Sequence, residues 1–225
     1  MAKKRKLTEI DNNLNDELTI SNYVSDVDKT LTENAILNIL HYIPKVDDIP
    51  RGVFLHQIFA IVENKTLVHT EVQQLKENGV IKLLYCLNQD GPSNFFIMFM
   101  SDYLNSIQFM INNLYSKSNN NDIDSSKKEI YKIRSKCLEK FCTYTITSKN
   151  ISIFREDILK TLSSDEIGEI IETGFLSHRR DIMSSEDIYW YSHPSFGYLN
   201  EWIRLTREYV KNTIHRKKYK EISCK

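Results

Sequence analysis

Glycine and cysteine are scarce in this chain, and their spacing excludes several kinds of site. Only six glycines occur among the 225 residues, and no two are separated by a single residue, so the sequence has no glycine-rich phosphate-binding loop. The four cysteines form no Cys-x-x-Cys pair and have no histidine at zinc-ligand spacing, which argues against a zinc site and a disulfide framework. His-Arg-Asp, Asp-Phe-Gly, His-Glu-x-x-His and Gly-x-Ser-x-Gly motifs are also missing. We therefore expect a protein that is not an enzyme and uses no catalytic residue, metal, cofactor or small-molecule substrate.

Long apolar runs are missing as well. No run approaches the roughly 20 residues that a helix needs to cross a bilayer, and no signal-peptide core follows the start. The sequence therefore predicts a soluble, intracellular protein without a membrane partner. With 41% apolar and 11% aromatic residues, the chain can still form packed cores.

The chain has no net charge, because it contains thirty basic and thirty acidic residues. A uniformly basic nucleic-acid binder is thereby excluded. The distribution is uneven, however: residues 127–149 carry seven Lys/Arg against two acids, residues 200–225 carry eight against three, and residues 150–199 carry four against nine. We expect a polyanion to meet the chain at the two basic segments.

Residues 64–100 show the pattern of a helix followed by two strands. Val68, Val72 and Leu75 recur at helical spacing, and Gly79 follows as the left-handed residue that ends a helix. Residues 80–87 and 95–100 are β-rich runs separated by turn-forming residues. A helix, a glycine, a strand, a turn and a strand form the second half of a winged helix, in which the helix is usually offered to a DNA groove.

The same unit occurs twice. Residues 72–81 align without a gap to residues 167–176, so that Gly79 corresponds to Gly174 at an offset of 95 residues. The second copy is also followed by a strand-like run, a polar turn and an aromatic strand. This duplication predicts an α+β, mostly helical protein built of tandem winged-helix modules, each a helix-turn-helix with a β-wing.

We expect five segments along the chain. They are a flexible basic and polar tail (1–31), a first winged helix with a following helix (32–115), a polar linker (116–126), a second winged helix (127–198) and a long basic C-terminal helix that begins a third module (199–225). Within the two modules, residues 53–62 and 153–162 are expected to be the second helices. The helix over 127–145 is expected to bury Ile130, Ile133, Cys137, Phe141 and Tyr144, while its lysines are either solvated or available to a polyanion.

Candidate DNA contacts lie near the end of the chain. The last helix carries a stripe of cations at helical spacing, and the second wing carries two arginines beside His178. These candidates are Arg179, Arg180, Arg204, Arg207, Lys211, His215, Arg216, Lys217, Lys218 and Lys220. A linear row of cations is suited to contact the phosphates of a DNA backbone. The alternative is a solvated helix end whose cations interact favourably with the helix dipole. The helix after Ser163 opens with a capping box to Glu166 and exposes acidic residues, so it is a poor surface for phosphates.

A second basic cluster lies in the tail. Lys3, Lys4, Arg5 and Lys6 suit recognition as a nuclear localisation signal, and an ordinary solvated tail is the alternative.

Together these residues resemble the serine/threonine-protein kinase 19 family, whose later name is winged-helix repair factor. The first module resembles it through residues 75–81 and 97–103. The second resembles it through Glu166-Ile167, Gly174-Phe175-Leu176, Arg179, Tyr189-Trp190, Pro194-x-x-Gly197, Arg207 and Lys218-Tyr219-x-Glu221. Family DNA-contacting cations fall on His215, Arg216 and Lys218. A family lysine is replaced by Glu201, and the family chain continues into a third winged helix.

The resemblance implies a nuclear, chromatin-associated and non-enzymatic protein, with the cytoplasm as a second compartment. It implies sequence-independent binding of double-stranded DNA and a scaffold role in transcription-coupled nucleotide excision repair. The implied partners are RNA polymerase II, Cockayne-syndrome factors, the UV-stimulated scaffold protein and transcription factor IIH. Two alternatives are a protein-interaction module of the transcription machinery whose acidic helix docks on a basic partner, and a kinase as the old family name suggests. The sequence offers little support for the kinase.

Overall fold

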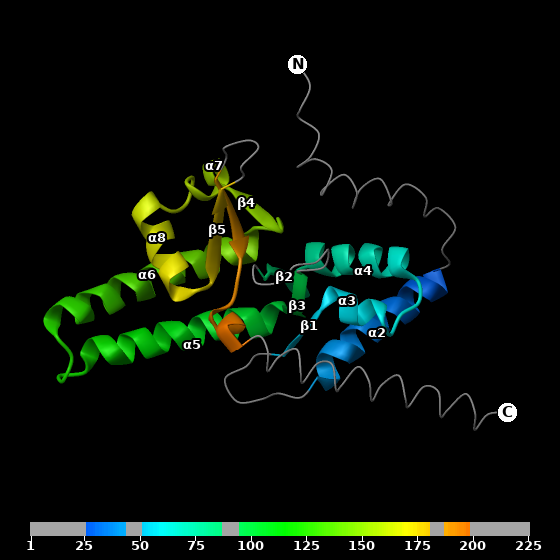
Figure 1. Ribbon diagram of the computed structural model, residues 1–225, viewed down its shortest axis with the longest axis horizontal. Helices are drawn as coiled ribbons and strands as arrows, with labels where there is room; N and C mark the ends of the chain where they lie inside the picture. The colour runs from blue at the N-terminus through cyan, green and yellow to red at the C-terminus, as the bar shows by residue number, and fades with distance from the viewer. Residues whose placement is uncertain (1–25, 44–50, 87–94, 181–186, 199–225) are drawn as a thin grey trace, which may run out of the picture.

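The computed structural model describes residues 26–43, 51–86, 95–180 and 187–198. The fold is α+β and mostly helical, with two small antiparallel sheets of three strands each (Figure 1). This confirms the class that the sequence predicts.

The chain contains two units with the same order of elements. The first comprises α2 (Asp26–Tyr42), β1 (Gly52–Phe54), α3 (Leu55–Phe59), α4 (Lys65–Glu77), β2 (Ile81–Tyr85) and β3 (Phe95–Phe99). The second comprises α6 (Ser125–Thr147), β4 (Ser152–Phe154), α7 (Arg155–Ile158), α8 (Ser164–Thr173), β5 (Leu176–Arg180) and β6 (Asp187–Tyr191). Helix α5 (Met100–Asn119) connects the units, and the short 3-10 helix η2 (Pro194–Tyr198) follows the second. The strand orders, β1-β3-β2 and β4-β6-β5, are equivalent, so the duplication is confirmed.

Local chemistry sets the ends of α4 and α8. Asn64 caps α4 by accepting a hydrogen bond from the Leu67 amide, and Ser163 and Glu166 form the expected capping box at the start of α8. After α4, Gly79 adopts φ 71° while the Val80 amide donates to the Leu75 carbonyl, which completes a Schellman motif. Gly174 ends α8 with φ 84°. The two glycines therefore play the role that their alignment predicts.

Three expected helices have different bounds. The first helix begins at Asp26, so the expected tail of residues 1–31 overlaps α2. The expected second helices at 53–62 and 153–162 each begin as a strand, β1 or β4, and continue as a much shorter helix. The reason is tertiary, because Val53 and Ile153 pair with Ile97 and Tyr189 in the sheets, and this pairing overrides local helical spacing.

The expected polar linker at 116–126 is mostly helical. Helix α5 extends to Asn119, and α6 begins at Ser125 with Asp124 as its N-cap. The two helices pack side by side (Figure 1), and the Tyr115 hydroxyl donates to Glu139 at 3.0 Å. Packing against α6 therefore extends α5 through serines and asparagines that have weak helical preference. The division of the chain into modules at this segment stays a prediction.

The first sheet is buried on both faces. Val53, Leu83 and Ile97 point into a core formed with α2, α3 and α4. Their neighbours Phe54, Leu84 and Phe96 point to the opposite face, into a second core. Alternate side chains of one strand thus belong to two different cores, which explains why these strands are mostly apolar, with Lys82 of β2 as an exception.

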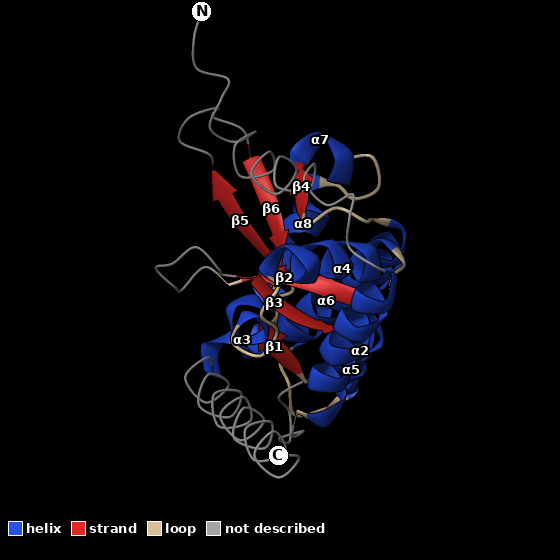
Figure 2. Ribbon diagram, turned by 90° about the vertical axis from the view of Figure 1, so that its right-hand side faces the viewer, coloured by secondary structure: helices blue, strands red, loops and turns tan. Residues whose placement is uncertain are grey.

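The second core is shared by both units. It joins α5 and the second unit, including α6, to one face of the first sheet. The two sheets meet where β2 contacts β6 (Figure 2). At its centre, Tyr103 of α5 is fully buried and donates a hydrogen bond to the Phe175 carbonyl at 3.1 Å. Its ring makes edge contacts with Phe175 and Tyr191. Burial raises the pKa of Tyr103, so its hydroxyl remains a donor across the physiological range.

The buried face of α6 differs from the expectation. Cys137 and Phe141 are buried and Tyr144 is half-buried, but Ile130 and Ile133 are 42% and 43% exposed. Leu138 and Thr145 are buried in their place. The first turns of α6 lie beside the end of α5 and extend past the core (Figure 1). Apolar residues at helical spacing in these turns are therefore not buried as the periodicity predicts.

Glycine substitutions test the two helix ends. Gly79→Ala should cost about 1–2 kcal/mol of unfolding free energy, because alanine is strained at positive φ although the site has space. Gly174→Ala should cost more, since a Cβ there would also lie 3.0 Å from the Pro194 Cα. Gly168→Ala is the matched control: it is exposed within α8, so alanine should stabilise by about 0.4–1 kcal/mol. Denaturant unfolding would measure all three, and equal losses for Gly79→Ala and Gly174→Ala would contradict the Pro194 contact.

Candidate nucleic-acid interface

Most of the predicted DNA contacts lie outside the described residues. This applies to Arg204, Arg207, Lys211 and the remaining cations at 215–220, and to the basic cluster at residues 3–6. Arg179 and Arg180 are described as part of β5, where they pair in register with Ile188 and Asp187. Strand β5 is an outer strand of its sheet, so both arginines belong to an edge strand, and their contact with DNA stays a prediction.

An ionic cluster surrounds Asp187 at the start of β6. His178 of β5 approaches one carboxylate oxygen with its Nε2 at 2.9 Å, and Arg155 donates from Nη1 to the other at 2.7 Å. Hydrogen bonding to His178, and then to Arg155, lowers the pKa of Asp187 below its usual value, so the carboxylate stays ionised. The cluster joins the second sheet to α7. Sequence reasoning missed Arg155, which lies in a predicted helix and has no neighbouring motif.

The acidic helix α8 is paired with α6. Lys140 forms an ion pair with Glu166, and Arg134 contacts Glu169 at 2.7 Å and Glu172 at 3.6 Å. The hydrogen bond from Lys140, and then that from the Ser163 amide, lowers the pKa of Glu166. Three carboxylates of α8 therefore face intramolecular cations, while Asp165 is exposed. These ion pairs partly neutralise the acidic face of α8, and the expectation that α8 is a poor surface for phosphates stays a prediction.

Helix α4, the counterpart of α8, has a different charge pattern. Lys65 is exposed and Lys76 half-buried, whereas Glu71 faces inward at 3% exposure. Glu77 is exposed and accepts a hydrogen bond from Gln73 at 2.7 Å. The accessible face of α4 is consequently less acidic than that of α8, so of the two equivalent helices α4 is the better suited to a polyanion.

One cation is buried between the two units. Lys82 of β2 is 3% exposed, its Nζ lies 3.4 Å from the centroid of the Tyr191 ring, and it donates to the Ser148 carbonyl at 3.4 Å. Burial, followed by repulsion from Lys76, lowers its pKa from 10.5 to about 7. Lys82 therefore serves the contact between units and is unavailable to phosphates.

Sites for other chemistry are not found in the part of the chain that the structure describes. Its histidines, cysteines and acids form no group of three or more that could hold a metal ion. Within the same residues, no helix has both the length and the apolar character required to span a membrane.

Comparison with known proteins identifies a family. The family model described as inactive serine-threonine protein kinase 19 matches residues 22–225. No curated protein matches the chain.

The buried lysine predicts a pH-dependent stability. Between pH 7 and about 10, the folded protein binds fewer protons at Lys82 than the unfolded chain does, so unfolding free energy should rise with pH in this window, by up to about 1.4 kcal/mol per pH unit. Lys82→Met removes the titrating group and keeps a long apolar side chain. Denaturant unfolding of both proteins from pH 6 to 9 should show the parent gaining stability relative to the variant. Parallel profiles would show that Lys82 does not titrate in this range.

Proposed function

This chain belongs to the inactive serine-threonine protein kinase 19 family, whose model matches residues 22–225, and from this membership we propose its function. The protein is a tandem winged-helix, double-stranded DNA-binding scaffold. It does not act as a kinase, and the family's description as inactive agrees with the absence of phosphate-binding loops and kinase motifs from the sequence.

The winged-helix assignment rests on the order of elements in both units. Each unit runs helix, strand, helix, helix, strand, strand, and each places its first strand beside its last. In this arrangement α4 and α8 are the third helices, and the β2–β3 and β5–β6 hairpins are the wings. The duplicated arrangement, with Arg179 and Arg180 on an edge strand, is the observation that carries the proposal.

DNA contacts in this proposal are contacts to phosphates. The second wing supplies Arg179 and Arg180, and the basic stripe from Arg204 to Lys220 supplies a row of cations. Contacts of this kind orient a duplex without reading its bases, so binding is largely independent of sequence and strongly dependent on salt.

The biological role follows from the family resemblance. We place the protein in the nucleus, in transcription-coupled nucleotide excision repair, beside RNA polymerase II, Cockayne-syndrome factors, the UV-stimulated scaffold protein and transcription factor IIH. The alternative is a protein-interaction module with little DNA affinity, which zero net charge favours. Docking through α8 would require its carboxylates to exchange their α6 partners for those of another protein.

Fluorescence anisotropy of a random-sequence duplex at several salt concentrations tests the proposal. The full chain should bind with an affinity that falls steeply as salt rises, because each phosphate contact adds about 0.9 to the slope of the logarithmic plot. The triple variant Arg207→Glu, Arg216→Glu, Lys218→Glu should lose most binding and reduce this slope by about 2–3.

The matched control reverses three lysines on α6, Lys127→Glu, Lys132→Glu and Lys136→Glu, which are all exposed. It has the same change in net charge and should retain more affinity than the C-terminal variant. An unchanged slope in the C-terminal variant would remove the stripe from the interface. Negligible duplex binding by the parent protein at physiological salt would favour the interaction module instead.

A further inference from the structure

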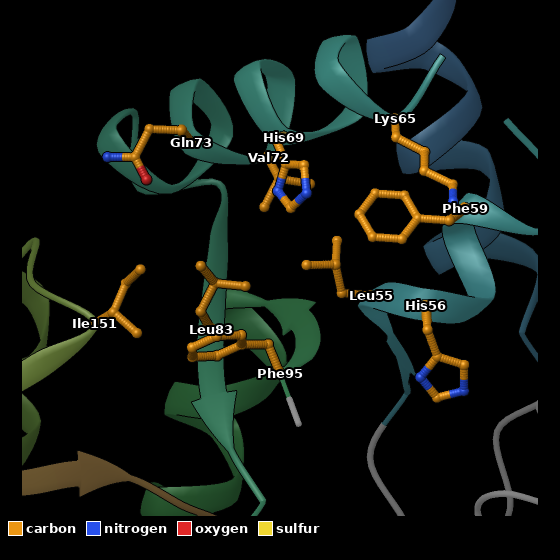
Figure 3. A pocket seen from close by; sticks show the side chains of 10 residues that line it. All are labelled: Leu55, His56, Phe59, Lys65, His69, Val72, Gln73, Leu83, Phe95 and Ile151. Atoms are coloured by element: carbon orange, nitrogen blue, oxygen red, sulfur yellow. The ribbon is translucent and has the colours of Figure 1, made fainter. Parts of the chain in front are cut away.

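A pocket of about 410 Å³ lies between α4 and the elements that α4 covers (Figure 3). Side chains of α4 form one side, and α3, β2 and β3 provide the other. The volume falls in the range of about 300–1,000 Å³ that is typical of binding pockets, and it suits one or two anchoring side chains.

The pocket is lined mainly by apolar side chains, and lysine and histidine are among its other lining residues. Leu55, Phe59, Val72 and Leu83 contribute hydrocarbon surface, and Figure 3 shows them facing the same space. Three of the other lining residues are Lys65, His56 and His69, and no aspartate or glutamate is among the lining residues that the structure describes. A mainly apolar lining that includes basic side chains is complementary to a ligand that combines an apolar anchor with negative charge.

One wall comes from the second unit. Ile151 lines the pocket opposite the α3 side, three residues after Ser148, whose carbonyl accepts the hydrogen bond from Lys82 (Figure 3). The pocket thus lies where the two units meet, and the contact that fixes Lys82 also holds the segment that carries Ile151. This placement makes the pocket a property of the assembled pair of units.

The chemistry of the walls distinguishes a peptide from a nucleic acid. Single-stranded bases are bound on open aromatic faces, but the Phe59 ring packs against His69 with centroids 4.9 Å apart. Phe95 lies within 5.7 Å of the Tyr85 ring and 6.4 Å of the Trp190 ring. The remaining walls are largely aliphatic and suit an aliphatic or aromatic side chain, and a duplex is too wide for a pocket of this volume.

We propose that this pocket binds an acidic peptide segment of a partner protein, with a leucine or phenylalanine anchor inside and carboxylates beside Lys65, His56 and His69. The site goes beyond the proposed DNA-binding function, because it is formed mainly by the first unit, with Ile151 as one wall, and uses none of the cations assigned to DNA. It has the opposite charge preference to the expected docking of α8 on a basic partner.

A binding assay with a defined probe tests this site in the 225-residue chain. The probe is a short fluorescein-labelled peptide that alternates Glu-Asp pairs with single Leu and Phe residues. Two control peptides replace its acids by lysines or its Leu and Phe by serines. The acidic peptide should bind, and both controls should bind at least about tenfold more weakly, because each lacks one half of the complementarity.

Two variants locate the site. Lys65→Glu with His56→Glu places a negative charge at two exposed positions, and Gln73→Trp fills the pocket from the half-buried flank of α4 without changing charge. Each should weaken peptide binding at least about tenfold, while Lys127→Glu with Lys132→Glu on α6 should retain it. Circular dichroism and the unfolding midpoint verify that each variant is folded.

The remaining outcomes would each overturn the proposal. Equal binding of the acidic and lysine peptides, or equal binding by all variants, would place the peptide elsewhere. Loss of duplex affinity in the Lys65 and His56 variant, with no peptide binding by the parent, would assign the pocket to DNA. Self-association of the parent in sedimentation, abolished by Gln73→Trp, would assign it to a second copy of the chain. The C-terminal triple variant should bind the peptide normally, so this proposal and the DNA proposal fail separately.

Discussion

The hydrogen bond from the Tyr103 hydroxyl to the Phe175 carbonyl is the constraint on which the arrangement of the two units depends. Tyr103 belongs to the helix that follows the first unit, and Phe175 follows the glycine that ends α8. Tyr103 is fully buried, so an unpaired hydroxyl there would cost about 1–3 kcal/mol, whereas the Phe175 carbonyl also accepts from the Ser192 amide. The bond therefore favours one orientation of α5 on the second unit. Loss of this orientation would expose apolar surface on both units at once, since the core around Tyr103 includes side chains from each.

This shared core changes what each sheet can do. One face of the first sheet packs on its own helices, and the other packs on α5 and the second unit, so most side chains on both faces are buried, although Leu83 also lines the α4 pocket. Accessible functional surface is therefore confined to edge strands, helix flanks and hairpin ends. The α4 pocket lies along such a flank, and the buried Lys82 shows that a lysine on a sheet face is engaged in the contact between units.

Sequence reasoning succeeded where a residue's role is local. Gly79 and Gly174 require positive φ, and Ser163 and Glu166 satisfy each other's amides, so these features follow from short-range chemistry and were predictable. It failed where long-range packing decides. Residues 116–119 are helical because α6 packs beside α5, and Ile130 is exposed despite its periodicity. The same limit applies to the candidate sites: Arg155 joins the Asp187 cluster through β-strand pairing, and Ile151 reaches the pocket through contact between units.

The charged side chains of the two units are arranged differently. In the second unit, the carboxylates of α8 are paired with Arg134 and Lys140, so its internal charges are largely matched and its candidate phosphate contacts lie on β5 and the C-terminal stripe. In the first unit, Lys65, His56 and His69 surround an apolar pocket whose lining residues include no carboxylate. A duplex and an acidic peptide would be attracted by the same sign of charge but would meet different elements. Because the peptide adds negative charge to the first unit, its binding would also weaken phosphate contacts that lie within a Debye length of about 10 Å.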